Sequence, residues 1–192
     1  MYLSRLIVDS RTKEGQKILA DLYRQHRMVM GGFKDYDSQE LGRVLFRLEP
    51  ESKEVVFLLV QSQKEPDWSH LESFVHTETK RFDLSLPKGI YRFRLRANPV
   101  VTRNKKRYGL VGEKDQRAWL LKKETGFEWK DFRIIDEGHL IMTKNGKRVF
   151  YKSVRFEGLA QVNDPKKALM TINEGIGPAK GFGFGLLSFA KV

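Results

Sequence analysis

Along the first 86 residues, segments with the apolar spacing of a strand alternate with segments that have the apolar spacing of a helix. Val55–Gln61 is a continuous apolar run, typical of a central strand, whereas residues 12–29 place apolar side chains at helical spacing. Ser10 or Thr12 can cap that helix, and a glycine pair after it ends it. In chain order, the pattern predicts a strand at 4–8, a helix at 12–29, strands at 42–49 and 55–61, a helix at 66–74 and a strand at 77–86. This β-α-β-β-α-β order is that of a ferredoxin-like fold.

The rest of the chain repeats that order after a turn signal at Pro87-Lys88-Gly89. Asp164 can cap a helix that has Pro165 in its first turn and ends at Gly175. The predicted elements are a strand at 90–101, a helix at 113–124, strands at 129–135, 139–143 and 148–162, a helix at 165–174 and a strand at 182–190. We therefore predict an α+β protein of two tandem ferredoxin-like (RRM-like) βαββαβ domains, residues 1–86 and 87–192.

Composition adds a charge asymmetry to this picture. The 192-residue chain carries 36 Lys and Arg against 24 Asp and Glu, a formal net charge of +12. Residues 1–86 have a net charge of −1 and residues 87–192 one of +13, so the whole excess lies in the second half. A folded basic chain of this kind favours a polyanion such as nucleic acid, or an anionic membrane.

What the sequence lacks narrows the classes of protein further. There is no cysteine, which excludes disulfides, thiolate metal sites and a cysteine nucleophile and fits a reducing compartment. The longest aliphatic run, Val55–Val60, is far shorter than the roughly 20 residues that span a bilayer. No basic stretch lies opposite a long apolar face. We therefore expect a cytoplasmic protein without a membrane partner.

Basic side chains gather at three places in the second half. Arginines alternate along the strand at 90–101, a dense basic loop follows it, and a later hairpin turned by Asn145-Gly146 carries further cations. An isolated charge run is usually a solvated loop, but three such groups on one domain favour contacts to the phosphates of duplex RNA. The predicted RNA-binding residues are Arg94 and Arg96, then Arg103, Lys105, Lys106 and Arg107, then Lys144, Lys147, Arg148, Lys152 and Arg155.

Residues 175–185 hold 5 of the 16 glycines. This segment leaves a helix and enters a strand, the reverse of a dinucleotide-binding fingerprint, and the chain has no Walker loop. Glycine allows close backbone approach, with amides that can bind anionic oxygens, whereas the alternative is a tight connection that uses glycine only to turn. We include Gly177, Lys180, Gly181 and Gly183 among the candidate RNA contacts.

His26 is the histidine with the most suggestive neighbours. Tyr23 lies three residues earlier on the same predicted helix face, and both rings are expected to point toward the glycine-rich turn that precedes Lys34. A helical His beside a Tyr is more often structural, and the sequence chemistry alone leaves that alternative open. The other three histidines have no partner that the sequence identifies and are treated as ordinary surface or strand residues.

Carboxylates after the first helix suggest a different chemistry. Asp35, Asp37 and Glu40 raise the possibility of a divalent-metal nuclease. A polar loop is the stronger interpretation, because no second carboxylate cluster is spaced to complete such a site. We assign the chain no metal site and no cofactor.

Several motifs, in this order and spacing, resemble one known family over essentially the full length of the chain. They are the opening Met1-Tyr2-Leu3-Ser4, Tyr23 with His26, Phe93-Arg94-Leu95-Arg96-Ala97-Asn98-Pro99, Phe156-Glu157-Gly158 and the closing Gly175-Ile176-Gly177-Pro178-Ala179-Lys180 with Gly185-Leu186-Leu187-Ser188. The chain is similar to the CasE family, the CRISPR RNA-processing endoribonucleases of type I-E systems. Arg94–Pro99 and the terminal glycine motif are the most specific of these matches.

The resemblance implies two ferredoxin-like domains, cutting of precursor CRISPR RNA at the base of each repeat's stem-loop, retention of the mature RNA and assembly into Cascade. It implies a catalytic role for His26, with Tyr23 carried over as well and Lys34 in the matching neighbourhood. The corresponding chemistry is metal-independent attack by a ribose 2′-hydroxyl on the adjacent phosphorus, which gives a 2′,3′-cyclic phosphate and a 5′-hydroxyl.

Two other functions remain open at this point. The first is a non-catalytic RNA-binding protein of two RRM-like domains, although no stretch matches the aromatic consensus of base-stacking RRM sheets. The second is a structural subunit of a ribonucleoprotein, in which the basic half only neutralises phosphates.

Overall fold

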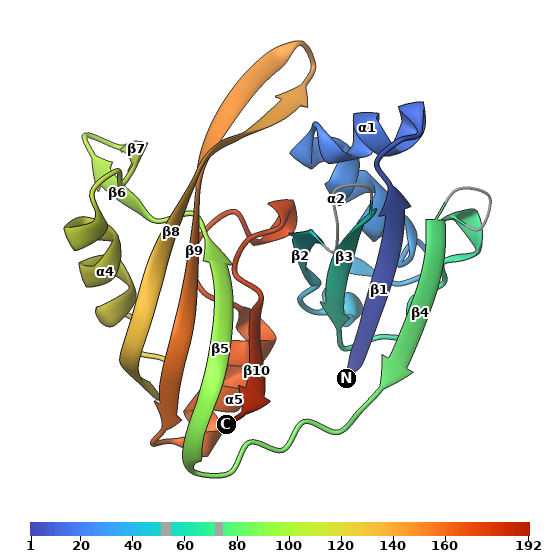
Figure 1. Cartoon of the computed structure of the whole chain (residues 1–192). Helices are drawn as coiled ribbons and strands as arrows, with labels where there is room; N and C mark the ends of the chain where they lie inside the picture. The colour runs from blue at the N-terminus through green and yellow to red at the C-terminus, as the bar shows by residue number, and fades with distance from the viewer. Residues whose placement is uncertain (51–54, 72–74) are drawn as a thin grey trace. The chain divides into compact units, whose positions relative to one another are not determined.

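Each half of the chain contributes a four-stranded antiparallel sheet to the computed structural model, which describes residues 1–50, 55–71 and 75–192 (Figure 1). Contacts divide the chain into two units. The first unit contains Met1–Asp83, Ile141–Val149 and Gly181–Gly183. The second unit contains Leu84–Leu140, Phe150–Lys180 and Phe184–Val192.

The sheet of the first unit has the strand order of a ferredoxin-like fold. Its strands are β1 (Tyr2–Asp9), β2 (Leu45–Pro50), β3 (Val55–Ser62) and β4 (Val75–Arg81). They are ordered β2-β3-β1-β4, and the register places Leu6 opposite Leu58 and Thr77. The apolar run at 55–61 is thus an inner strand, as predicted. Buried side chains of β1 and β3 pack with those of the following helices into one core.

The single helix predicted for residues 12–29 is wrong: the structure has two. α1 spans Lys13–Leu19 with Thr12 as its N-cap, and α2 spans Leu22–Gly31 with Asp21 as its N-cap. Asp disfavours helix interiors and favours N-caps, because its carboxylate accepts hydrogen bonds from unpaired first-turn amides. The break at Asp21 therefore has a local cause. α3 (Ser38–Leu41) follows, with Asp37 as its N-cap.

The second helix predicted for this half is also wrong in its described part. Residues 69–71 form one 3-10 turn, η1 (Ser69–Leu71), and residues 72–74 of the prediction lie outside the described residues. The Asp67 carboxylate accepts from the Ser69 amide, and Trp68 and Leu71 are buried in the core. β4 ends at Arg81 and not at residue 86.

The second unit repeats the same topology. Its sheet is formed by β5 (Gly89–Ala97), β8 (Phe127–Lys144), β9 (Lys147–Val162) and β10 (Leu187–Lys191), ordered β10-β5-β9-β8. The ends of β8 and β9 that meet at their turn, within Ile141–Val149, are counted with the first unit. Its helices are α4 (Glu113–Leu121) and α5 (Pro165–Glu174), and Trp119 of α4 stacks on Phe156 of β9. Two ferredoxin-like sheets with their helices are thus present, as the sequence predicts.

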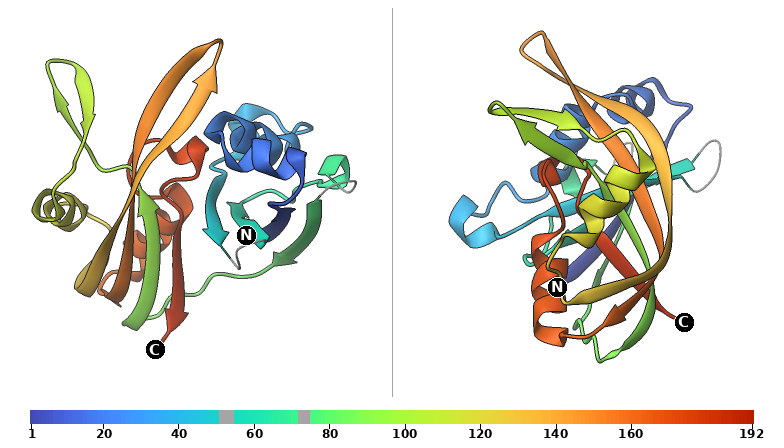
Figure 2. Two further views of the ribbon diagram at one scale, coloured as in Figure 1. Left: turned by 45° about the horizontal axis from the view of Figure 1, so that its top comes forward. Right: turned by 90° about the vertical axis from the view of Figure 1, so that its left-hand side faces the viewer.

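Three element predictions for this unit need correction. The strands predicted at 129–135 and 139–143 form one strand, β8. The predicted strand at 90–101 ends at Ala97, and a separate hairpin of β6 (Val100–Arg103) and β7 (Lys106–Gly109) follows (Figure 2). The last strand begins at Leu187 and not at residue 182, because η2 (Lys180–Phe182) and two glycines with positive φ, Gly183 and Gly185, precede it. No helix among the described residues is long and apolar enough to cross a membrane.

Candidate functional site

His26 lies near the middle of α2 and contacts a segment that is 155 residues away in sequence. Its Nδ1 is 2.8 Å from the carbonyl oxygen of Gly181, and its ring is half-buried. Two aromatic rings lie close to it. The ring centroids of Tyr23 and Phe182 are 6.4 Å and 5.4 Å from the centroid of the His26 ring. The two predicted catalytic rings are thus adjacent. The sequence predicted that these rings face the glycine-rich turn after the helix. In the structure, His26 contacts the 181–183 segment instead.

The Gly181 carbonyl determines which ring nitrogen of His26 can exchange a proton. A carbonyl oxygen only accepts hydrogen bonds, so Nδ1 must carry hydrogen and donate it. In the neutral ring Nε2 then holds the lone pair and can accept a proton, and in the charged ring Nε2 can donate one. Among the described residues, none hydrogen-bonds to Nε2. Nε2 is therefore the atom available for acid-base chemistry.

Asp21 fixes the start of the helix that carries both rings. Its Oδ1 accepts from the backbone amides of Tyr23 at 2.7 Å and Arg24 at 3.3 Å, and its Oδ2 accepts from the amide of Thr143 at 2.9 Å. Burial acts to raise the pKa of Asp21, but hydrogen bonds from the Thr143 side chain and from these backbone amides hold it below its ordinary value. The carboxylate is therefore ionised at neutral pH.

The turn between β8 and β9 brings a cation to Tyr23. Asn145 and Gly146 form this turn with positive φ angles of 50° and 73°, as a two-residue hairpin requires. The Nζ of Lys144 lies 5.4 Å from the centroid of the Tyr23 ring. Lys147 and Arg148 follow the turn and are exposed. The site thus combines an imidazole, a phenol and an ammonium group.

The third residue predicted to be catalytic is not part of this group. Lys34 is exposed after α2, and its charge acts on Asp67 to help lower the pKa of that carboxyl, after the larger effect of hydrogen bonds from Ser69. No contact between Lys34 and either His26 or Tyr23 occurs among the described residues.

The glycines of the closing motif have separate roles. Gly181 presents its carbonyl to His26, whereas the sequence suggested that its amide would bind anions. Gly183 has a φ of +84°, and a Cβ there would come within 3.1 Å of the Phe46 ring. Gly177, with a φ of +86°, lies against the ring of Trp119. Lys180 is half-buried at the start of η2.

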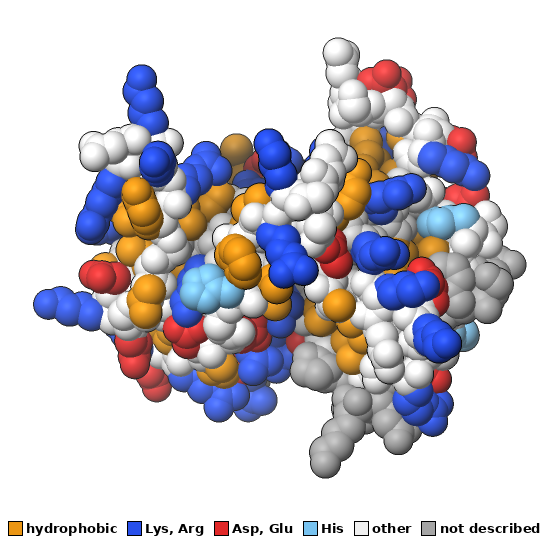
Figure 3. All heavy atoms as spheres, turned by 90° about the horizontal axis from the view of Figure 1, so that it is seen from above, with side chains coloured by type: hydrophobic (Ala, Val, Ile, Leu, Met, Phe, Trp, Pro, Cys, Tyr) orange, Lys and Arg blue, Asp and Glu red, His pale blue; other side chains and the backbone are white. Residues whose placement is uncertain are grey.

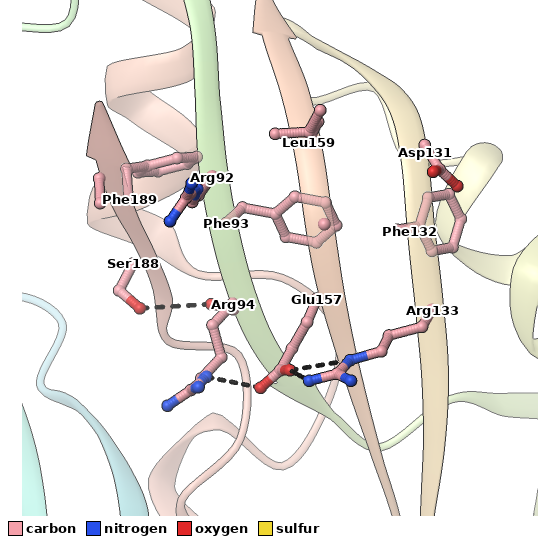
Figure 4. A pocket seen from close by; sticks show the side chains of 12 residues that line it. Arg92, Phe93, Arg94, Asp131, Phe132, Arg133, Glu157, Leu159, Ser188 and Phe189 are labelled. Atoms are coloured by element: carbon pink, nitrogen blue, oxygen red, sulfur yellow. Dashed lines mark hydrogen bonds and ion pairs between the residues drawn. The ribbon is translucent and has the colours of Figure 1, made fainter. Parts of the chain in front are cut away.

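Four arginines of the second unit's sheet form ion pairs on its outer face. Arg94 and Arg133 contact Glu157 at 2.6 Å and 2.8 Å, at an open hollow in this face (Figure 4). Arg155 lies 3.4 Å from Glu157, while Arg96 pairs with Glu137 at 2.7 Å. Burial acts to raise the pKa of Glu157, but these arginines hold it below its ordinary value. The face is therefore less positive than its arginines suggest.

The remaining predicted RNA-binding cations divide into buried and exposed ones. Lys152 is buried, with its Nζ 2.6 Å from Asp136 Oδ1. The turn of the β6–β7 hairpin, in contrast, exposes Arg103, Lys105, Lys106 and Arg107. Figure 3 shows Lys and Arg side chains spread over the displayed face, with acidic side chains between them. Apart from Arg94, which is exposed but paired with Glu157, the exposed cations of the predicted set thus lie in the two hairpin turns.

The carboxylates considered for a metal site do not gather. Asp37 caps α3 through the Gln39 amide, and Asp35 and Glu40 are exposed. Among the described residues, no group of three or more His, Asp or Glu side chains is arranged to hold a metal ion.

Two features of the site were missed from the sequence. Asp21 was placed inside a continuous helix, although an Asp after Ala20 is an N-cap signal. The Gly181 carbonyl carries no sequence signal, because every residue has one.

Comparisons with known proteins show the family of the chain. The sequence matches the family model described as CRISPR associated protein over residues 1–191. The CRISPR-associated endoribonuclease Cse3 of Thermus thermophilus is 33% identical over 210 residues, which cover 99% of this chain and 100% of that protein. The CRISPR system Cascade subunit CasE of Escherichia coli K12 is 31% identical over 207 residues, which cover 100% of both.

The fold comparison gives the same result. The solved structure of Thermus thermophilus Cse3 bound to an RNA representing a pre-cleavage complex has a TM-score of 0.88 to this chain at 32% identity. The match covers 98% of each chain.

Proposed function

The chain belongs to the family of CRISPR-associated proteins, and on that premise we propose that it is an endoribonuclease that cuts precursor CRISPR RNA. Two relatives that match it from end to end are named as an endoribonuclease and as a Cascade subunit. The observation that carries the proposal is the pairing of His26 Nδ1 with the Gly181 carbonyl, which leaves Nε2 for proton transfer.

The proposed reaction uses the RNA's own nucleophile. The 2′-hydroxyl upstream of the cut attacks the adjacent phosphorus, the bond from phosphorus to the 5′-oxygen breaks, and the products are a 2′,3′-cyclic phosphate and a 5′-hydroxyl. His26 Nε2 takes the proton from the 2′-hydroxyl or gives one to the 5′-oxygen, since imidazole exchanges protons near neutral pH. Such a residue typically contributes about 10²–10⁴-fold to the rate.

Tyr23 and Lys144 have supporting roles in this reaction. A phenol is a poor base at neutral pH, so we assign Tyr23 to positioning the 2′-hydroxyl or the phosphate. The ammonium group of Lys144, close to the Tyr23 ring, is placed to stabilise the added negative charge of the phosphorane. Within the described parts of the chain, Lys34 forms no hydrogen bond, ion pair or ring contact with His26 or Tyr23, and we leave it out of the proposed mechanism.

The proposed substrate is the stem-loop of a CRISPR repeat, cut at the base of its stem. The cations of the two hairpin turns are suited to bind phosphates on a duplex, because they are exposed. Arg96 and Lys152 of the sheet, in contrast, are held in ion pairs with carboxylates. We propose further that the mature RNA stays bound and that the protein joins Cascade, in the cytoplasm where the transcript is made. Residues 1–86 and 87–192 are the proposed folding domains, since each range supplies all four strands of one sheet.

The mechanism makes a direct prediction about the substrate. A repeat RNA with a single 2′-deoxy nucleotide upstream of the cut should bind as the all-ribose RNA does but remain uncut, because the nucleophile is absent. The products and binding are measured by gel electrophoresis and by filter binding. Full cleavage of the deoxy substrate would refute the mechanism.

Metal independence is tested in the same assay. We expect cleavage of the all-ribose RNA to persist in excess EDTA. Loss of activity that returns with Mg²⁺ would favour a metal-assisted reaction instead. Tight binding of a repeat RNA without any cut would support a non-catalytic RNA-binding subunit.

A further inference from the structure

Asp21 makes two different connections with the two oxygens of one side chain. Oδ1 caps α2, the helix that carries Tyr23 and His26, through the amides of Tyr23 and Arg24. Oδ2 accepts from the amide of Thr143, at 2.9 Å across 122 residues of sequence. The Thr143 side chain also helps to hold the pKa of Asp21 below its ordinary value. A helix cap needs only the first connection, so the second calls for an explanation.

The second connection ends beside the cations of the β8–β9 turn. Thr143 directly precedes Lys144, whose ammonium group lies over the Tyr23 ring, and Lys147 and Arg148 follow the turn. These residues and α2 belong to the same unit of the structure. One carboxylate therefore ties the backbone that carries these cations to the first turn of the helix that carries the acid-base group.

We propose that Asp21 is a positioning residue that fixes the β8–β9 turn relative to His26, so that RNA held by the turn is aligned for cutting. This inference rests on the proposed endoribonuclease function. Misplacing reacting groups by about 1 Å can cost on the order of 10²-fold in rate. The hydrogen bond to Thr143 thus acts on the rate of cutting and not on how tightly the RNA is held.

Two substitutions separate the cap from the connection to Thr143. Asp21→Ser keeps a hydroxyl that can cap α2 but is too short to reach both partners. Asp21→Asn keeps the oxygen that caps α2 but places a side-chain NH₂ group opposite the backbone N–H of Thr143. Both groups are hydrogen-bond donors, so the bond between them is lost. Asp164→Asn is the matched control, because Asp164 caps α5, another ten-residue helix, through the Lys167 amide.

The first readout separates rate from affinity. With enzyme in excess over a repeat RNA, both Asp21 variants should cut about 10–100-fold more slowly at saturation. Their half-saturating concentration should change less than about threefold, and Asp164→Asn should behave as the unsubstituted protein. Unchanged saturating rates in folded Asp21 variants would overturn the proposal, as would a loss that appears only in affinity.

The second readout needs no activity. Amide hydrogen exchange of the free protein should show faster exchange at residues 141–149 in Asp21→Ser, with residues 24–31 of α2 still protected. Unchanged protection at 141–149 would overturn the proposal even if cutting were slowed. Absence of cutting by the unsubstituted protein would instead refute the proposed function, and the exchange data would still decide whether Asp21 holds the turn.

Discussion

At the scale of single residues, the proposed acid-base chemistry depends on a backbone atom. The Gly181 carbonyl holds Nδ1 of His26 at 2.8 Å and so selects the tautomer with a free lone pair on Nε2. The rings of Phe182 and Tyr23 lie close to the His26 ring. A side chain in place of this carbonyl would be visible in the sequence, whereas a carbonyl is not. This is why the sequence offered His26 as a candidate but not the atom that orients its ring.

Replacing His26 tests its role directly. We expect His26→Ala to lower the single-turnover rate of cutting by about 10²–10⁴-fold, because the proton-transfer group is lost, while RNA affinity changes little. Rate and affinity are measured on the same repeat RNA. His76→Ala is a matched control, since His76 is exposed and pairs only loosely with Glu78 at 3.7 Å. Unimpaired cutting by His26→Ala would remove His26 from the site.

At the scale of elements, the hydrophobic period predicted the strands well because each sheet buries one face. β5 shows this most clearly, with Tyr91, Phe93 and Leu95 buried and Arg92 and Arg94 exposed. The order of strands in both sheets follows from the βαββαβ order of elements. The fold class could therefore be predicted from the amino-acid sequence alone.

The elements that were predicted wrongly depend on tertiary contacts. Asp136-Glu137-Gly138 reads as a turn, but Lys152 pairs with Asp136, and Arg96 and Ser153 bind Glu137, so β8 continues through it. The β6–β7 hairpin turns at Asn104-Lys105, two residues with positive φ and no glycine, and so lacks the usual hairpin signal. The pairing of α2 with the 181–183 segment lies equally beyond local sequence.

Gly158 is a test of how closely β8 and β9 approach each other. A Cβ at this position would lie 2.1 Å from the backbone oxygen of Asp131 and 2.5 Å from the Cα of Phe132. Because backbone cannot move aside as a side chain can, Gly158→Ala should destabilise the protein by about 3 kcal/mol or more. Urea unfolding measures the change in the free energy of unfolding.

The matched control for this prediction is the next residue of β9. Leu159 is half-buried, on the opposite face of the sheet from Gly158. Leu159→Ala should therefore cost less than about 1.5 kcal/mol. A Gly158→Ala variant as stable as Leu159→Ala would show that the two strands separate easily.

At the scale of the whole molecule, the net charge of +12 overstates the charge that RNA can reach. Several cations on the outer sheet face of the second unit and at the base of the β8–β9 hairpin are held in ion pairs, such as Arg96 with Glu137 and Lys152 with Asp136. The accessible cations of the predicted set are concentrated in the two hairpin turns. Burial and pairing, which the sequence does not give, decide which cations take part.

This distribution predicts the salt dependence of RNA binding. Each phosphate contact that releases a counterion contributes about 0.9 to the slope of log affinity against log salt for a duplex. Replacing Lys147 and Arg148 by Gln should therefore lower that slope by about 1–2, because both are exposed beside the β8–β9 turn. Binding is measured by filter assay from low to high salt, on uncleavable 2′-deoxy repeat RNA.

The control removes the same charge from other surfaces. Lys114 of α4 and Lys166 of α5 are exposed in the first turns of their helices, where a cation is unfavourable, so replacing both by Gln should not harm the fold. If binding responds only to net charge, both double variants will lower the slope equally. If the turn itself holds the phosphates, only the Lys147 and Arg148 variant will do so. Equal slopes would therefore contradict an RNA-binding role for the β8–β9 turn, because the net charge is the same in both.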